Sequence, residues 1–271
     1  MKETYIHPLD REMSGKVLEN PVVKKFLDTI FNENLDEINS YVYSVSGIQL
    51  QKSHLAVQYL KEGCKMFGVS SVPPVYIKRS YQYDVKCIGY ENPVITISHQ
   101  LLEREDTEIL RGRMMAAAAS IKAGHHKLAF LIWIMENFSG AIPIPFATTV
   151  IRGFLYQWYR AQFYTLDRAF FLAVCDKKLA LKNVLYGEIP FEMLENYTFG
   201  ENDTYLKQVK EFYKTSDVVE GISKIVGIFQ CEIWLPSRYH ELWEFCEEVK
   251  NEHFNNYTSG RTRSLTQDSG K

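Results

Sequence analysis

The stretch from Asp106 to Met135 limits the possible fold most strongly. It contains no proline and is rich in Ala, Leu, Met and Arg, so it predicts one long helix or two abutting helices. The chain before it has a different character, because short segments rich in β-formers alternate with turn formers such as Gly89 and Asn92-Pro93. Three strands of a small sheet are predicted there, at Val75–Lys78, Val85–Ile88 and Val94–Ile97.

Helical spacing of apolar residues predicts further helices on both sides of this region. Two lie before the sheet, at Asn20–Ile38 and Ser53–Phe67, with Gly68 as a C-terminal stop for the second. The later helices are predicted at Ile151–Val174, Leu206–Thr215, Val218–Val226 and Tyr239–Phe254. The sequence therefore predicts an α+β fold, with a small sheet in the N-terminal half and a predominantly helical body. We expect a single domain over residues 1–256 and a flexible polar tail over residues 257–271.

Composition removes several classes of partner and compartment. Thirty-one basic residues against thirty-three acidic ones leave a formal net charge of -2, which disfavours nucleic acid as a partner. The polar N-terminal segment, with Pro8, lacks the apolar stretch of a signal peptide, so a cytoplasmic location is expected. The five cysteines are scattered without a C-x-x-C pair, which is typical of buried, reduced thiols.

Residues 128–159 are the most apolar part of the chain. Glu136, Pro143 and Pro145 interrupt this region, and neither part reaches the roughly 18 to 20 unbroken apolar residues of a membrane span. Buried helices are the favoured interpretation. Peripheral contact with a membrane through this region stays open as the alternative.

Several segments together resemble one family of enzymes. The segments are YIHPLDR, VITISHQLL, ILR, IKAGH and WYRAQFYTLDRAFFLAV, at Tyr5–Arg11, Val94–Leu102, Ile109–Arg111, Ile121–His125 and Trp158–Val174. In their order and spacing the chain is similar to the soluble HtpX-like gluzincin zinc metallopeptidases, to which the CAAX prenyl endopeptidases are related. The resemblance covers nearly the whole chain and implies a gluzincin-like α+β fold.

The zinc site of that family is missing from this sequence. In the family, the segment E-L-R-x-x-x-x-H-E-x-x-H-I-K-x-G-H supplies two zinc-binding histidines and a glutamate that acts as general base. A gap-free match places the two ligand positions on Ala116 and Ser120 and the base on Ala117, while the third ligand, a later glutamate, has become Phe163. Alanine has no lone pair to offer, and a serine hydroxyl is a poor neutral ligand beside imidazole. The resemblance therefore implies a pseudopeptidase without metal or cofactor.

Some residues around that site are kept. Asp167 and Arg168 match the family's Asp-Arg, whose aspartate orients a zinc-bound histidine, and His125 matches a position that does not bind zinc. With its histidine gone, Asp167 is expected to pair with Ser120, Arg168 or another partner. Relatives also carry a His-Pro element before a closing helix, and here Pro236-Ser237-Arg238 stands in its place.

Binding can persist without zinc, because an edge strand recognises a peptide through backbone hydrogen bonds. The resemblance implies that residues 83–97 form the hairpin and edge strand beside the cleft. The candidate peptide contacts are Tyr83, Val85, Val94, Ile95, Thr96 and Ile97. We therefore expect a catalytically inactive protein that binds a peptide or a partner protein as an adaptor, carrier or regulator.

Two alternatives from other classes remain. One is an active hydrolase whose metal or nucleophile has moved to other residues, for example Asp167 with His125 or His126. The other is a purely structural subunit whose cleft is filled by Phe163 and its neighbours. No feature of the sequence indicates an oligomeric state.

Overall fold

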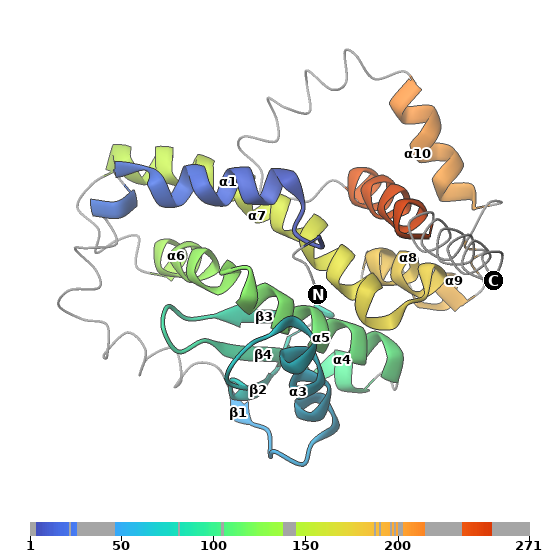
Figure 1. Ribbon diagram of the computed structural model, residues 1–271, viewed down its shortest axis with the longest axis horizontal. Coiled ribbons are helices and arrows are strands. Elements are labelled where there is room, and N and C mark those ends of the chain that lie inside the picture. The colour runs from blue at the N-terminus through green and yellow to red at the C-terminus, as the bar shows by residue number, and fades with distance from the viewer. Residues whose placement is uncertain are drawn as a thin grey trace, which may run out of the picture.

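The computed structural model has the predicted α+β architecture, with helices around one small sheet (Figure 1). It describes residues 4–21, 23–25, 47–80, 82–103, 106–137, 145–186, 188–189, 191–195, 197, 199, 203–214 and 235–250. Most of the helix predicted at Asn20–Ile38, all of the one at Val218–Val226 and the tail after residue 256 lie outside these ranges.

The sheet has four strands in the order β1-β2-β4-β3. They are β1 (Ile48–Gln49), β2 (Val75–Lys78), β3 (Val85–Ile88) and β4 (Val94–Ser98). The central pair, β2 and β4, is parallel, whereas β1 and β3 pair antiparallel with their neighbours. The three predicted strands are thus confirmed, and β3 is an edge strand. The two-residue β1 was not predicted, since so short a segment has no periodicity to detect.

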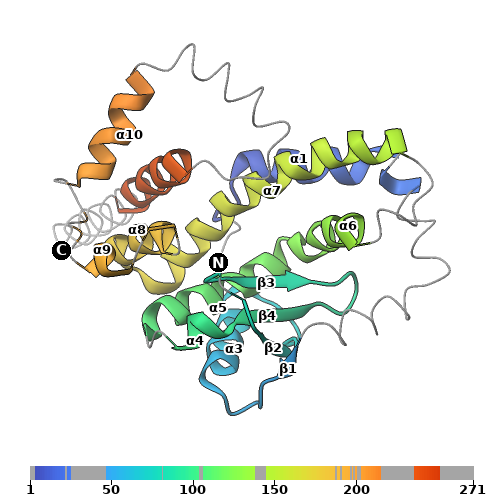
Figure 2. The same ribbon diagram turned by 180° about the vertical axis from the view of Figure 1, so that it is seen from behind.

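The helices make up most of the described chain. They are α1 (Pro8–Glu19), α3 (Leu55–Phe67), α4 (His99–Glu103), α5 (Thr107–Lys122), α6 (His125–Asn137), α7 (Pro145–Val174), α8 (Lys177–Leu185), α9 (Phe191–Glu195), α10 (Thr204–Lys214) and a final helix over residues 235–250. Both views show α5 and α6 between the sheet and the pair α1 and α7 (Figure 1, Figure 2). Among the described residues, no helix combines the length and apolarity needed to cross a membrane.

The proline-free stretch forms two abutting helices, α5 and α6, which was one of the two predicted alternatives. Asp106 caps the start of α5 by accepting a hydrogen bond from the backbone N–H of Ile109 at 3.2 Å. The helix ends at Ala123 and Gly124, and Gly124 has φ +78°, a left-handed conformation that favours glycine. This break lets His125 begin a helix with a new direction.

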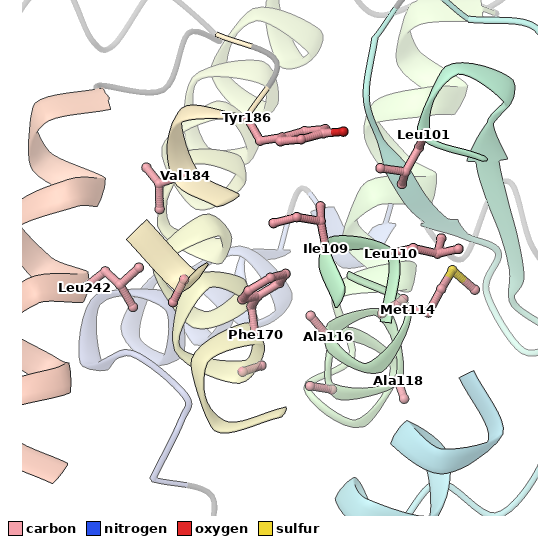
Figure 3. Close-up of a cluster of buried hydrophobic side chains, with 14 of the residues drawn as sticks. Leu101, Ile109, Leu110, Met114, Ala116, Ala118, Phe170, Val184, Tyr186 and Leu242 are labelled. Carbon is pink, nitrogen blue, oxygen red and sulfur yellow. The ribbon is translucent and has the colours of Figure 1, made fainter. Parts of the chain in front are cut away.

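Close packing on both sides explains the alanine run of α5. A Cβ atom on Gly63 of α3 would lie 2.7 Å from Met115 Cα and 3.1 Å from Ala118 Cβ, so α3 and α5 approach nearly backbone to backbone. On the other side, a Cβ on Gly112 would lie 2.3 Å from the ring of Phe170. Figure 3 shows Ala116 on the side of α5 that faces Phe170 and Ala118 on the opposite side. Larger side chains at Gly63 or Gly112 would push these helices apart.

The cysteines follow the prediction with one exception. Cys64, Cys87 and Cys246 are free and buried, and burial raises the pKa of the Cys64 thiol to about 11. Cys175 is free but exposed, so the prediction of burial was wrong there, because this residue lies in the turn between α7 and α8 with φ +54°. Cys231 lies outside the described residues.

Candidate functional site

Helices α5 and α7 carry the positions that match the zinc ligands of the family resembled, and the two helices pack against each other. Gly112 lies against Phe170, and the rings of His125 and Trp158 lie 5.7 Å apart. The residue numbers rise along α5 while they fall along α7, so the two helices are antiparallel. Ala116 and Ala117 of α5 belong to the same buried core cluster as Phe170 of α7.

The residues at these positions do not fit a zinc ion. Ala116, Ala117 and Ser120 are each 6% exposed, and none of them carries an imidazole or a carboxylate. Phe163 offers a ring where a carboxylate is needed, and its ring packs edge-on against Tyr159 with centroids 5.3 Å apart. Within the described ranges, no group of three or more His, Cys, Asp and Glu side chains is placed to hold a metal ion.

A positively charged side chain lies beside Phe163. The guanidinium carbon of Arg238, from the final helix, lies 4.9 Å from the centre of the Phe163 ring. Its Nε and Nη2 atoms donate to the two carboxylate oxygens of Asp167 at 2.9 and 2.8 Å. The partner of Asp167 is therefore Arg238, and neither Ser120 nor Arg168 takes that place. This two-pronged pairing is the strongest geometry that an arginine and a carboxylate can make.

The charge on Arg238 is stabilised by its partner. Burial opposes a charge on this guanidinium, but the attraction and hydrogen bonds of Asp167 outweigh burial and raise the pKa of Arg238 above its ordinary value. Both side chains are buried, with side-chain exposures of 10% for Arg238 and 3% for Asp167. The site thus holds a permanent organic cation next to the aspartate that, in the family resembled, supports a metal ligand.

Arg168 takes a different direction from Asp167. Its Nη2 atom lies 3.8 Å from a carboxylate oxygen of Glu241, and its guanidinium lies 4.6 Å from the Phe245 ring. Glu241 also accepts a hydrogen bond from Nε2 of His7 at 3.1 Å. Arg168 therefore joins α7 to the final helix and to the start of α1.

A second arginine, Arg113, lies on α5, the helix that carries Ala116, Ala117 and Ser120. It donates to the side-chain oxygen of Asn183 at 2.7 Å and to the backbone oxygen of Tyr186 at 3.1 Å, and it lies 5.3 Å from the centre of the Tyr186 ring. All of its hydrogen-bond partners are neutral. Burial, followed by the positive charge of Arg238, lowers the pKa of Arg113 to about 10.

His125 belongs to a buried hydrogen-bond network centred on Asp10. The carboxylate of Asp10 accepts hydrogen bonds from His125 Nε2 at 2.7 Å, Thr165 Oγ1 at 2.6 Å, Trp158 Nε1 at 3.1 Å and Ser14 Oγ at 3.2 Å. Burial would raise the pKa of Asp10, but the bond to His125 and the other donors lower it below its ordinary value. The segments YIHPLDR, IKAGH and WYRAQFYTLDRAFFLAV therefore meet at this one carboxylate.

These contacts do not bring together the residues of the relocated hydrolase. Asp167 is occupied by Arg238, and His125 is occupied by Asp10. His126 is buried, and burial together with the charges of Lys127 and His125 lowers its pKa to about 4. The three side chains have different surroundings and form no catalytic group among the described residues.

The predicted peptide contacts divide between the two strands of the β3–β4 hairpin. β4 pairs with β2 on one side and with β3 on the other, so Val94, Ile95, Thr96 and Ile97 have no free edge, and the prediction that they bind a peptide backbone was wrong. The outer edge of β3 makes no backbone hydrogen bond to the described part of the chain. Tyr83 and Val85 thus remain as candidates, and the Tyr83 ring packs edge-on against Tyr186 at 5.3 Å.

Sequence reasoning missed Arg113 and Arg238 as members of the site. Arg113 lies three residues before Ala116 and four before Ala117, so helical spacing places it on the same face of α5. Arg238 stands in the segment that replaces the His-Pro element of the family resembled. Both positions were visible in the sequence, but the choice of a partner for Asp167 needed the packing of the final helix.

Comparison of this chain with family models, with curated proteins and with solved structures finds no match.

Proposed function

We propose that this protein is a metal-free relative of the gluzincin metallopeptidases, acting in the cytoplasm by binding a peptide or a partner protein. The observation that carries the proposal is the pairing of Arg238 with Asp167 beside Phe163. A guanidinium next to the ligand positions repels a divalent cation, so the site is specialised for something other than zinc.

The difference between kept and lost residues supports this interpretation. His125, Trp158 and Thr165 each donate a hydrogen bond to Asp10 in the core, and these four residues come from three of the segments that carry the resemblance. The substituted positions are those that the family's chemistry requires. Selection that preserves the fold but not hydrolysis accounts both for the kept core residues and for the substituted positions.

Binding is favoured over a purely structural role by two features of the described residues. The outer edge of β3 makes no backbone hydrogen bond to the described residues. Arg113 lies near the beginning of that strand through Tyr186 and Tyr83, and Arg238 lies beside Phe163. A filled, inert core has no need of charged side chains there, because burying charge costs free energy.

Metal analysis and a capture experiment test the proposal. We expect purified protein to contain far less than one zinc per chain and to show no chelator-sensitive peptidase activity. In a pull-down from the native cell, Ala117→Arg should lose partners that the wild type retains, whereas Lys122→Glu, on the exposed side of the same helix, should keep them. Stoichiometric zinc with peptidase activity would overturn the loss of catalysis. Retention of the same partners by the folded Ala117→Arg protein would overturn binding at this site.

A further inference from the structure

Arg113 carries a charge without an acidic partner in contact. Its Nε and Nη2 atoms donate to the side chain and backbone of Asn183 and to the backbone of Tyr186, all of them neutral oxygens. Asp167 and Asp84 act on its charge only from beyond salt-bridge distance. A partly buried guanidinium in these surroundings gains from the approach of an anion.

Both arginines also have an unused donor. Nε and Nη2 of Arg238 are taken by Asp167, and no described residue accepts a hydrogen bond from Nη1 of either Arg113 or Arg238. Neither Nη1 atom is among the fully buried side-chain atoms without a partner, so both retain some access from outside. Burial and the charge of Arg238 both lower the pKa of Arg113. Arg238 is already paired with Asp167, so Arg113 is the cationic position that a carboxylate can neutralise.

This position lies at the beginning of the free edge of β3. Arg113 stacks on the ring of Tyr186, which contacts the ring of Tyr83, two residues before the strand starts at Val85. The other end of β3 has apolar surroundings, since Ile88 packs in a cluster with Phe130 and Ile134 of α6. The cationic position and the open edge therefore meet only at the start of β3.

We propose that the site recognises the C-terminal carboxylate of an extended peptide that pairs antiparallel with the start of β3. Antiparallel pairing runs the peptide toward the beginning of β3, which brings its last residue to Tyr83, Tyr186 and Arg113. A main-chain carboxylate at that end continues directly from the paired backbone and matches the fork of a guanidinium. This inference rests on the proposed binding function and specifies the chemistry of its ligand.

The test uses two pools of random-sequence octapeptides, acetylated at the N-terminus, that differ only in a free or an amidated C-terminus. The immobilised full-length protein is incubated with each pool, and retained peptide is quantified by mass spectrometry. We expect the free-carboxylate pool to be retained about tenfold more than the amidated pool, as a charge-assisted hydrogen bond implies. Arg113→Gln should remove this preference, and Arg113→Lys should leave only part of it, because lysine keeps the charge without the fork.

The matched control is Arg111→Gln. Arg111 lies on the same helix but pairs with Glu62 and Glu108 away from the site, so this variant should keep the full preference. Thermal unfolding confirms that each variant is folded, and the comparison of the two pools on the wild type needs no variant. Equal retention of the two pools, or preference for amidated peptides with acidic side chains, would overturn the C-terminal inference while leaving peptide binding intact. Retention of neither pool would overturn the inference and the peptide form of the proposed function together.

Discussion

The two buried carboxylates of this protein, Asp10 and Asp167, have opposite surroundings. Asp10 accepts four side-chain hydrogen bonds from His125, Thr165, Trp158 and Ser14, and it is 1% exposed. Asp167 is held by a single partner, Arg238, whose remaining nitrogen is unused by the described residues. We call the Asp10 site the closed network, because four buried donors surround its carboxylate. We call Asp167 and Arg238 the open pair, because Nη1 of Arg238 donates to no described residue.

This difference separates contacts that hold the fold from contacts that the proposed function uses. The network of Asp10 ties α1, α6 and α7 together, so its residues are required in any protein with this arrangement. The pair of Asp167 and Arg238 joins α7 to the final helix beside Phe163, and two apolar residues of similar size would also fill that space. The proposed binding function accounts for a charged pair at that place.

The largest effect is expected at the closed network. Asp10→Leu should lower the free energy of unfolding by about 3–5 kcal/mol, and adding His125→Leu should restore little of it. The reason is that the N–H of Trp158 and the O–H of Thr165 remain buried without an acceptor. Urea unfolding of the two variants measures these free energies. Recovery of most of the stability in the double variant would contradict the stated difference between Asp10 and Asp167.

The open pair should behave differently. Arg238→Met alone leaves the Asp167 carboxylate buried without its partner and should cost about 2–4 kcal/mol in urea unfolding. Adding Asp167→Leu should bring stability back to within about 1 kcal/mol of the wild type, since both charges are then gone. The double variant should nevertheless lose peptide retention. A double variant as unstable as the single one would show that this pair, too, is a structural requirement.

Buried His126 is expected to make the stability of the protein depend on pH. Its pKa is about 4 in the fold, against 6.5 for an ordinary histidine, so the unfolded chain takes up the proton first. Stability from this group is complete above about pH 6.5 and falls as the pH drops from there toward 4, by about 2 kcal/mol. His126→Gln should flatten this part of the stability profile. An unchanged slope between pH 6.5 and 4 in the variant would assign the effect to other groups.

The smallest effect is expected at Glu241, which bonds to His7 but is 39% exposed at its side chain. Solvent screens this pair, so Glu241→Gln should change the free energy of unfolding by less than about 1 kcal/mol. The exposed pair of Lys16 and Glu12 serves as a reference for a surface contact. A loss at Glu241 comparable to that at Asp10 would mean that the closed network extends to the final helix.

The sequence predicted elements with strong local signals and missed those that depend on tertiary contacts. The three strands, α3 with its stop at Gly68 and the two abutting helices were found because periodicity and turn residues define them. The first helix, α1, was missed although Pro8 stands at its first position, because its N-cap is His7 and not one of the usual Ser, Thr, Asp or Asn residues.

The site was predictable only in part. Helical spacing and the family pattern identified Ala116, Ser120 and Phe163 as positions without zinc ligands, since that statement depends on residue type alone. The partner of Asp167 lies 71 residues away on the final helix, beyond the reach of any local pattern. The position of β4 inside the sheet likewise follows from pairing with β2 across a crossover.

Restoring a zinc site tests the central claim most directly. The variant combines Ala116→His, Ala117→Glu, Ser120→His and Phe163→Glu with Arg238→Ala, which removes the competing cation. A control shifts the two histidines and the intervening glutamate one residue along α5 and keeps the other two substitutions. We predict that zinc titration of the folded variant gives one tightly bound ion per chain and that the control binds none. A folded variant that binds zinc no better than its control would contradict the claim that this chain is a metallopeptidase scaffold without its metal.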